Sequence, residues 1–430
     1  MASNRRVRRI AGWIAKYFSD PLLKRIEDPR KKQGQRWSCL PLIKAVLLGL
    51  ASGCKGLTEV EELTAGMHSS VRKLIGIPKR IPDTTLRDYL CRLDPTSLSE
   101  VLYVVGYDAW RRKALRPNGD FPFAALSLDG KYPAIRDTEA STYLQVQHDE
   151  SGNAVRGLLR TTTATLVTAE GRPILAAIPV PGDSNEQGHF QHAFGEIVRM
   201  YGRLFRLVMY DAGAASKKNA DAVRKAGKDY FFQIADDRWV MHQTFSMLLA
   251  DKTPAASEET VVSSRERIVR HLSFVTLAPT QKNVTVWEHA KTALKVTSET
   301  FKDGMQTSTK TRYFATSLES KTLSPDKWLK LVVQRWGVET THQILDVAFS
   351  EDDRPWITAD AQGALAVMLL RRIAYTLVTL YRSVTQRSDE NRILPFRRIM
   401  GWIADTLKWP NANELEGFRG RQFQVPPALA

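Results

Sequence analysis

Cysteine is scarce in this sequence. The chain of 430 residues contains three, Cys39, Cys54 and Cys91, which lie far apart among apolar residues. Their spacing matches no CxxC or Cys/His pattern, so it predicts neither a zinc site nor a disulfide framework. We expect buried free thiols in a reducing compartment.

Long hydrophobic runs are also missing. A membrane span needs roughly 18 uninterrupted apolar residues, and the best candidate, 361–381, is interrupted by Arg371 and Arg372. The N-terminus is rich in arginine but has no long apolar segment behind it. A secretory signal is therefore not expected. The arginines fit an arm that binds DNA, with an organellar presequence as the alternative. We expect a cytoplasmic protein with no membrane partner.

Acidic residues are few relative to basic ones. The chain has 46 Asp and Glu against 62 Lys and Arg, a net charge of +16. Such an excess favours a polyanionic partner, and nucleic acid is the commonest one. The alternative is a globular protein that is merely basic. The hydrophobic content of 43% is ordinary, and the length suits two or three domains.

The first part of the chain, 1–118, has the pattern of an all-helical domain. An apolar helix is expected over 40–56, and Asp83 or Thr84 begins another that carries Arg87. Two short basic helices separated by a turn resemble a helix-turn-helix in outline, although a plain helical bundle fits equally well. Capping boxes are expected at two further helix starts, formed by Thr58 with Glu61 and by Ser97 with Glu100.

The period of the hydrophobic pattern changes near residue 121. Strand-like segments lie at 123–130, 157–168, 172–181, 204–213 and 229–235. Helical segments at 187–201 and 215–227 separate the later strands. Three antiparallel strands followed by helix-linked parallel ones predict a mixed α/β sheet, with the first and fourth strands as neighbours.

The chain beyond residue 118 divides into four segments. The first core segment is expected to be 119–236, followed by a β-rich insertion over 237–318. Core residues resume over 319–385 and a basic tail occupies 386–430. Strands in the insertion are expected at RIVRHLSFVTL, NVTVWEHAK and TRYFATSL.

A helix follows the insertion and runs through 327–353; its expected start is Ser324-Pro325, an N-cap followed by proline at the first helical position. Apolar residues recur on one side of it, whereas Arg335, Glu339, His342 and Asp346 fall at steps of three and four and share a second side. An acid, a guanidinium and an imidazole are thus projected together. The ordinary explanation is a solvated face with an Arg335–Glu339 pair.

Two acids upstream favour a functional explanation. Asp129 and Asp211 each end an apolar strand, and the carboxyl ends of strands in open α/β sheets are where sites form. With Glu339 they would make a pocket of hard oxygen ligands suited to Mg²⁺ or Mn²⁺. Two such ions can drive phosphodiester chemistry. The alternatives are ordinary turn acids and a glycosidase pair, the latter at odds with the positive charge.

The strings LSLDGK, LVMYDAG and QRWGVETTHQILDVAFSEDD resemble the DDE transposases of bacterial insertion sequences, and more narrowly their H-repeat-associated group. The resemblance implies a ribonuclease-H-like core with a β insertion before the final Glu. It implies Asp129, Asp211 and Glu339 as catalytic residues that bind two Mg²⁺ or Mn²⁺ ions. Arg335 matches a family arginine that contacts DNA near the cut. Val332 and Asp346 replace a tyrosine and a lysine of the broader pattern.

The resemblance also implies a function. The protein would bind terminal inverted repeats through 1–118, cleave the element ends and join their 3′-hydroxyls to target DNA. It would act as a homodimer on double-stranded DNA at the bacterial nucleoid. The alternatives are a domesticated, non-catalytic DNA-binding protein and a ribonuclease-H-like nuclease without strand transfer.

Further DNA-binding candidates follow from position. Lys131 follows the first aspartate, and Lys217 and Lys218 follow the second, so all three could contact phosphate. His342 could contact DNA or the edge of the site. In related enzymes an aromatic residue of the insertion stacks on a flipped base, a role open to Trp287, which could equally pack in the core.

Overall fold

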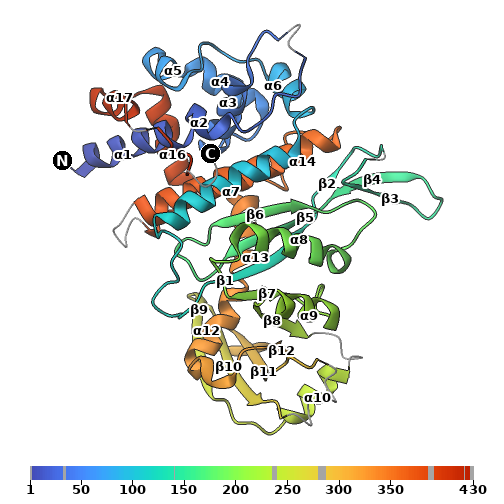
Figure 1. Cartoon of the computed structure of the whole chain (residues 1–430). Helices are drawn as coiled ribbons and strands as arrows, with labels where there is room; N and C mark the ends of the chain where they lie inside the picture. The colour runs from blue at the N-terminus through green and yellow to red at the C-terminus, as the bar shows by residue number, and fades with distance from the viewer. Residues whose placement is uncertain are drawn as a thin grey trace.

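The computed structural model has a mixed α/β architecture in which a nine-stranded sheet adjoins a large helical region (Figure 1). The fold class predicted from the sequence is confirmed. The structure describes residues 2–31, 35–139, 141–234, 240–278, 287–385, 392–420 and 422–426.

The helical region combines the two ends of the chain. Its N-terminal helices are α1 (Ala2–Tyr17), α2 (Asp20–Leu23), α3 (Cys39–Ala51), α4 (Leu57–Gly66), α5 (Ser69–Ile75), α6 (Asp83–Leu90) and α7 (Pro95–Arg111). Helices α16 (Phe396–Lys408) and α17 (Ala412–Phe418) lie beside α1 (Figure 1). Part of the range expected as a basic tail is therefore helical. Apolar residues spaced three and four apart bury one side of α16, among them Ile399 and Ile403.

The expected helix starts are partly correct. Helix α6 begins at Asp83 as predicted, but the capping boxes at Thr58 and Ser97 are wrong. Helix α4 begins one residue before Thr58, and the N-cap of α7 is Asp94, whose side chain accepts a hydrogen bond from the Thr96 amide. Pro95 in the first turn of α7 favours that helix start over the one predicted at Ser97.

The large sheet has the strand order β6-β5-β1-β7-β8-β12-β11-β10-β9. Its first part contains β1 (Ala125–Lys131), β5 (Thr161–Leu166), β6 (Ile174–Pro179), β7 (Leu207–Tyr210) and β8 (Asp229–Ile234). Strands β1 and β7 are parallel neighbours, with Ser127 opposite Met209. The predicted adjacency of the first and fourth strands is confirmed.

The segment predicted as one strand over 157–168 is two strands. It breaks at Arg160, whose Nη1 donates a hydrogen bond to the Ser184 carbonyl at 2.7 Å. The first half belongs to a small sheet of β2 (Ala134–Ile135), β3 (Leu144–His148) and β4 (Ala154–Leu159), and the second half is β5.

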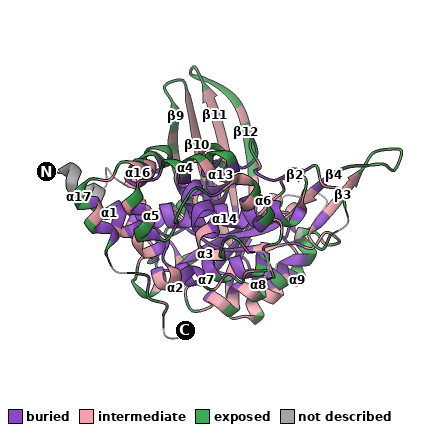
Figure 2. Cartoon of the chain, turned by 90° about the horizontal axis from the view of Figure 1, so that it is seen from above, coloured by how far each residue is buried: buried purple, intermediate pink, exposed green. Residues whose placement is uncertain are grey.

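The β-rich insertion continues the large sheet. Its strands are β9 (Ala256–Ser263), β10 (Glu266–Thr276), β11 (Thr292–Lys302) and β12 (Met305–Thr316), preceded by helix α10 (Val240–Leu248). Strand β12 pairs antiparallel with β8. Figure 2 shows β9–β12 projecting from the body of the protein with largely exposed and half-buried residues.

The strand predicted over 283–291 is wrong where it can be checked. Residues 283–286 lie outside the described part of the chain, and Glu288 and His289 form a turn. Trp287 and Ala290 are buried beside this turn, and the strand begins only at Thr292. Apolar side chains that pack in a turn gave a false strand pattern.

The late helix predicted over 327–353 is also two helices. A short 3₁₀ turn, Ser320–Thr322, precedes helix α12 (Pro325–Arg335). Trp336 separates α12 from helix α13 (Gly337–Phe349). At Gly337 a Cβ atom would lie 3.0 Å from the Arg172 side chain. Close packing against a distant turn therefore accompanies the break.

The sheet is covered on both faces. Phe190 of α8 (Glu186–Tyr201) packs on Tyr210 with ring centroids 5.5 Å apart, on the face shared with α9 (Lys217–Lys225). Trp328 of α12 packs on Phe231 from the other face, with ring centroids 6.3 Å apart. Because side chains alternate along a strand, these contacts place α8 and α12 on opposite faces.

Helix α14 (Ala361–Leu380), continued by a π-helical turn at Tyr381–Thr385, runs through the centre of the molecule (Figure 2). It is long and apolar enough for a membrane span by composition, but its apolar window is entirely buried. It contacts α3, α6 and α7 on one side and β6 and α13 on the other. It is therefore a core helix that both parts of the molecule share.

Candidate active site

The three acids come from three elements that meet at one edge of the sheet. Asp129 lies in β1, Asp211 directly follows β7 and Glu339 is in the first turn of α13. Extending the register in which Ser127 faces Met209 by two residues places Asp129 opposite Asp211. The Ser127 hydroxyl donates a hydrogen bond to the Arg335 carbonyl at 3.1 Å, so the end of α12 lies beside β1.

The charges of these acids influence one another. Burial raises the pKa of Asp211, and the Asp129 charge raises it further, although the Gly213 amide donates to Asp211 Oδ1 at 2.8 Å. Partial burial also raises the pKa of Glu339, where Arg335 opposes the effect and both aspartates add to it. Carboxylates that repel in this way are a favourable environment for a cation.

Asp129 and Glu339 have protein partners in this conformation. His342 Nδ1 lies 3.2 Å from Asp129 Oδ2, and Arg335 Nη2 lies 3.6 Å from Glu339 Oε1. Within the described residues, no three His, Cys, Asp or Glu side chains are close enough together to hold a metal ion. The hard oxygen donors fit Mg²⁺ or Mn²⁺ chemically, but their side chains would have to converge to bind one.

Arg335 and His342 are not on a solvated face. Their residues are 5% and 8% exposed, whereas the Glu339 side chain is 59% exposed. Arg335 Nε and His342 Nε2 are buried and have no hydrogen-bond partner among the described atoms. Burial lowers the pKa of the Arg335 guanidinium, while Glu339, Asp211 and Asp129 raise it. Two buried polar groups with unused donors or acceptors therefore border the acids.

Lys131 is held by two acids. Its Nζ lies 2.8 Å from Asp346 Oδ1 and 2.8 Å from Asp352 Oδ2. Burial lowers the pKa of Lys131, but its hydrogen bonds to these carboxylates outweigh burial and the net shift is upward. Asp352, which sequence analysis did not single out, lies just after α13, within the string QRWGVETTHQILDVAFSEDD that also holds Glu339 and Asp346.

The other DNA-binding candidates are dispersed. Lys217 and Lys218 are exposed in the first turn of α9, where Lys217 pairs with Asp221 at 2.6 Å. Arg87 is exposed on α6 in the helical region. Trp287 is 5% exposed, and its ring packs edge-on against aromatic residues of β8. In this conformation the Trp287 ring belongs to the core and cannot stack on a base.

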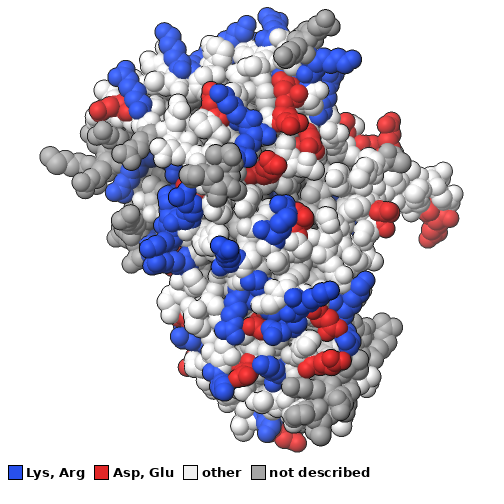
Figure 3. Space-filling model, in the orientation of Figure 1, with Lys and Arg blue, Asp and Glu red and all other residues white. Residues whose placement is uncertain are grey.

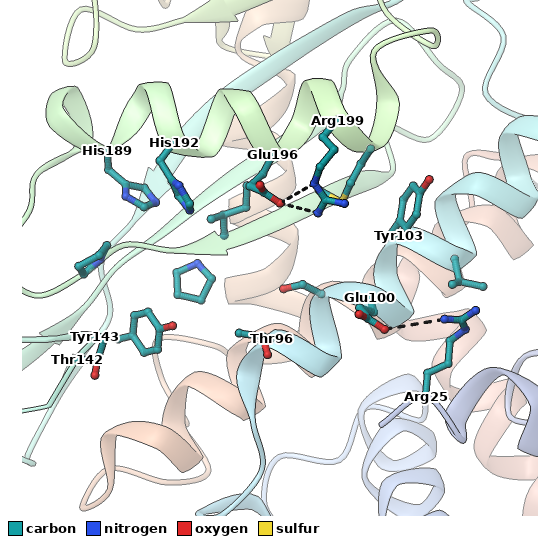
Figure 4. Close-up of a pocket in the computed structure, with 16 residues that line it drawn as sticks. Arg25, Thr96, Glu100, Tyr103, Thr142, Tyr143, His189, His192, Glu196 and Arg199 are labelled. Atoms are coloured by element: carbon teal, nitrogen blue, oxygen red, sulfur yellow. Dashed lines mark hydrogen bonds and ion pairs between the residues drawn. The ribbon is translucent and has the colours of Figure 1, made fainter. Parts of the chain in front are cut away.

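A cavity of about 740 Å³ lies between α7 and α8 (Figure 4). His189 and His192 of α8 face it from one side, and Tyr143 and Thr96 face it from the other. Its lining includes none of the three acids. The site formed by the three acids is thus separate from this cavity.

Two arginines near the acids were missed by sequence analysis. Arg270 of β10 and Arg312 of β12 lie 5.5 and 5.3 Å from the ring centroid of Trp336. The Arg312 charge also lowers the pKa of Glu339. Basic residues in predicted strands gave no signal of this convergence, because it depends on how β10 and β12 pair through β11.

Comparison with protein families agrees with the fold. The family model described as Transposase DDE domain matches residues 139–377, more than half of the chain, and the model described as DDE_Tnp_1-associated matches 21–104. The first range contains Asp211 and Glu339, whereas Asp129 precedes it. A search of curated proteins gave no match. The chain belongs to the DDE transposase family of insertion sequences.

Proposed function

We propose that this protein is an active transposase that binds the terminal inverted repeats of its element, cleaves the ends and joins their 3′-hydroxyls to target DNA. The observation that carries the proposal is the meeting of Asp129, Asp211 and Glu339 at one sheet edge. Family membership supports DNA as the substrate. The net charge of +16 supports a polyanionic partner.

Asp129, Asp211 and Glu339 would hold two Mg²⁺ or Mn²⁺ ions. When bound, such ions activate water or a 3′-hydroxyl and stabilise the leaving oxygen, so no covalent enzyme intermediate is needed. Binding would draw the carboxylates together and offset both the burial and the mutual repulsion that raise the pKa of Asp211 and Glu339.

Side chains around the acids would position the DNA. Arg335 offers an unused, buried Nε beside Glu339, and His342 orients one oxygen of Asp129 through their 3.2 Å contact. Lys217 and Lys218 are exposed just beyond Asp211 and would contact phosphates. Lys131 could do so only by exchanging its carboxylate partners for a phosphate.

The helical region would recognise the repeats, with Arg87 of α6 exposed for phosphate contact. Two element ends must be paired, so the DNA-bound protein would be a homodimer. The site of action would be the bacterial cytoplasm, at the nucleoid.

A strand-transfer assay tests the proposal. Labelled duplexes made from the DNA that flanks the gene are mixed with Mg²⁺, a supercoiled target and the full-length protein. We expect joined products. Nicks without joining would identify a nuclease instead, and a mobility shift without any chemistry would identify a non-catalytic DNA-binding protein.

Variants in the same assay test the site. Glu339→Gln should lower cleavage by at least about 100-fold, because a metal ligand is lost, while end binding persists. Asp326→Asn is the matched control, since Asp326 is an exposed acid in the first turn of the preceding helix α12. Full nicking activity in the Glu339→Gln protein would remove Glu339 from the site.

A further inference from the structure

Three arginines from separate elements converge on one indole ring. The guanidinium carbons of Arg270, Arg312 and Arg335 lie 5.5, 5.3 and 5.7 Å from the ring centroid of Trp336. Strand β10, strand β12 and the end of α12 supply one arginine each. The Trp336 ring is half-buried against the core under α12.

The register of the strands explains the convergence. Arg312 of β12 pairs with Val296 of β11, which pairs with Leu272 of β10. Paired residues of antiparallel strands point to the same face, as do residues two apart, so Arg270 and Arg312 share the face of Leu272. Helix α12 packs on this face. Arg270 and Arg312 therefore lie on the face of the sheet that α12 covers, next to the C-terminal end of that helix.

The positive charge of this cluster is only partly compensated by acids. Arg270 Nη1 donates to the Thr260 hydroxyl at 2.7 Å, but the Arg270 Nε is buried without a partner, as is Arg335 Nε. The Arg312 side chain makes no hydrogen bond or ion pair within the described residues. Glu339 lies 3.6 Å from Arg335, and Glu258 of β9 stands opposite Arg270. Burial lowers the pKa of Arg270; the Glu258 charge opposes this shift and the Arg312 charge adds to it.

Like charges held together over one ring favour an anion between them. A guanidinium presents a planar fork of donors that fits a phosphate, and stacking on an indole fixes the plane of that fork. The cluster is joined to the candidate active site, because Arg335 contacts both Trp336 and Glu339. Figure 3 shows basic side chains over the lower part of the molecule, where the sheet extension lies in Figure 1.

We infer that Arg270 and Arg312, both beside the Trp336 ring, form a subsite for a backbone phosphate of DNA next to the Glu339 side of the active site. The inference rests on the proposed function for its choice of DNA as the anion. It assigns the β insertion a direct part in holding the substrate strand. Exposed Lys310 extends the same face, because it pairs with Ser298, the partner of Arg270.

The salt dependence of DNA binding tests the inference. Binding of the full-length protein to a fluorescent duplex of about 30 base pairs is measured over a range of NaCl concentrations without divalent metal. Each phosphate contact contributes about 0.9 to the slope of log K against log[salt]. We expect the double variant Arg270→Gln/Arg312→Gln to lower the slope by about 2.

Arg267→Gln provides the matched control. Arg267 lies on the same strand but on the opposite face, stacks 4.5 Å from the Phe301 ring centroid and pairs with Glu259 at 2.8 Å. The slope of log K against log[salt] for the Arg267→Gln protein should match the wild-type slope. The double variant Arg270→Lys/Arg312→Lys keeps the charge, so it should retain most of the slope if phosphate contact is the cause. Thermal unfolding checks that every variant is folded.

Two results would overturn the inference. One is a wild-type slope in a folded Arg270→Gln/Arg312→Gln protein. The other concerns the change in Trp336 fluorescence on DNA binding, which is assigned to Trp336 by its loss in the Trp336→Phe protein. If inorganic phosphate at matched ionic strength reproduces this change fully, the site binds free anions and is not a DNA subsite. Because binding is measured without metal, a protein that fails to cleave DNA but shows the slope difference refutes the proposed function and leaves the subsite intact.

Discussion

At the scale of residues, Lys131 forms ion pairs with two acids and is not free for DNA. It was expected to contact phosphate, yet its ammonium group is 2.8 Å from carboxylates of both Asp346 and Asp352. The Lys131 and Asp346 side chains are 13% and 30% exposed, so solvent screens their attraction only in part. A double-mutant cycle of Lys131→Ala and Asp346→Ala should give a coupling energy of about 1 kcal/mol in urea unfolding. A coupling energy near zero would mean that Lys131 could exchange its carboxylate partners for a DNA phosphate without loss of stability.

His189 gives a prediction about pH. Its residue is 6% exposed, Nε2 has no partner among the described atoms, and burial lowers the pKa of the imidazole, as does the charge of His192. The unfolded chain therefore binds a proton more readily than the folded one, and stability falls as pH drops below about 6.5. In His189→Gln, urea unfolding at about pH 5.5 and 7.5 should differ less in free energy than in the wild type. His148→Gln, at an exposed site, should leave the wild-type difference unchanged.

At the scale of elements, the turn between β5 and β6 depends on Gly171. Its φ is 78°, and a Cβ atom there would lie 2.2 Å from Ser383 Oγ and 2.7 Å from Thr379 Cγ2. Gly171→Ala should cost about 2 kcal/mol of unfolding free energy, from backbone strain and a clash with α14 and its π-helical continuation. Gly152→Ala is the control, because Gly152 has φ 83° with open space around it. Equal losses in the two variants would show that strain alone acts.

The helices and strands predicted correctly from the sequence were those whose apolar residues recur with a clear helical or strand spacing. The strands that carry Asp129 and precede Asp211 were recognised from their apolar runs, although β1 continues to Lys131 and does not end at Asp129 as predicted. Connection rules made these strands neighbours. The break at Trp336 was missed because it accompanies packing of Gly337 against Arg172, which is far away in the sequence. The convergence of Arg270 and Arg312 on Trp336 was missed for the same reason, since the register of the strands cannot be predicted from composition.

The whole molecule is organised around α14, which contacts the helical region and the sheet alike. Separate unfolding of the two parts would expose apolar surface of this helix, where Leu370 and Leu377 are completely buried. We therefore expect one cooperative transition for the full chain, with circular dichroism and tryptophan fluorescence giving coincident curves. Two resolved transitions would show that the shared helix does not couple the parts.

The same helix carries buried charge. Arg372 of α14 pairs with Glu351, and their side chains are 0% and 1% exposed. Arg371 beside it is also buried, and burial lowers its pKa to about 10. Water cannot solvate an unpaired charge at this depth, so the pair matters chiefly through what its loss would leave behind.

Glu351→Ala should therefore destabilise the protein by about 3 to 5 kcal/mol, because Arg372 would remain charged and without its acid. Arg372 Nε and Nη2 have no hydrogen-bond partner in the described structure even when Glu351 is present, so no nearby group can substitute for it. The double variant Glu351→Leu/Arg372→Met removes both charges and should recover most of the loss. If Glu351→Ala and the double variant lose equal free energy in urea unfolding, packing volume rather than unpaired charge would be the cause. A smaller loss in the double variant would show that α14 tolerates its charges only as a pair.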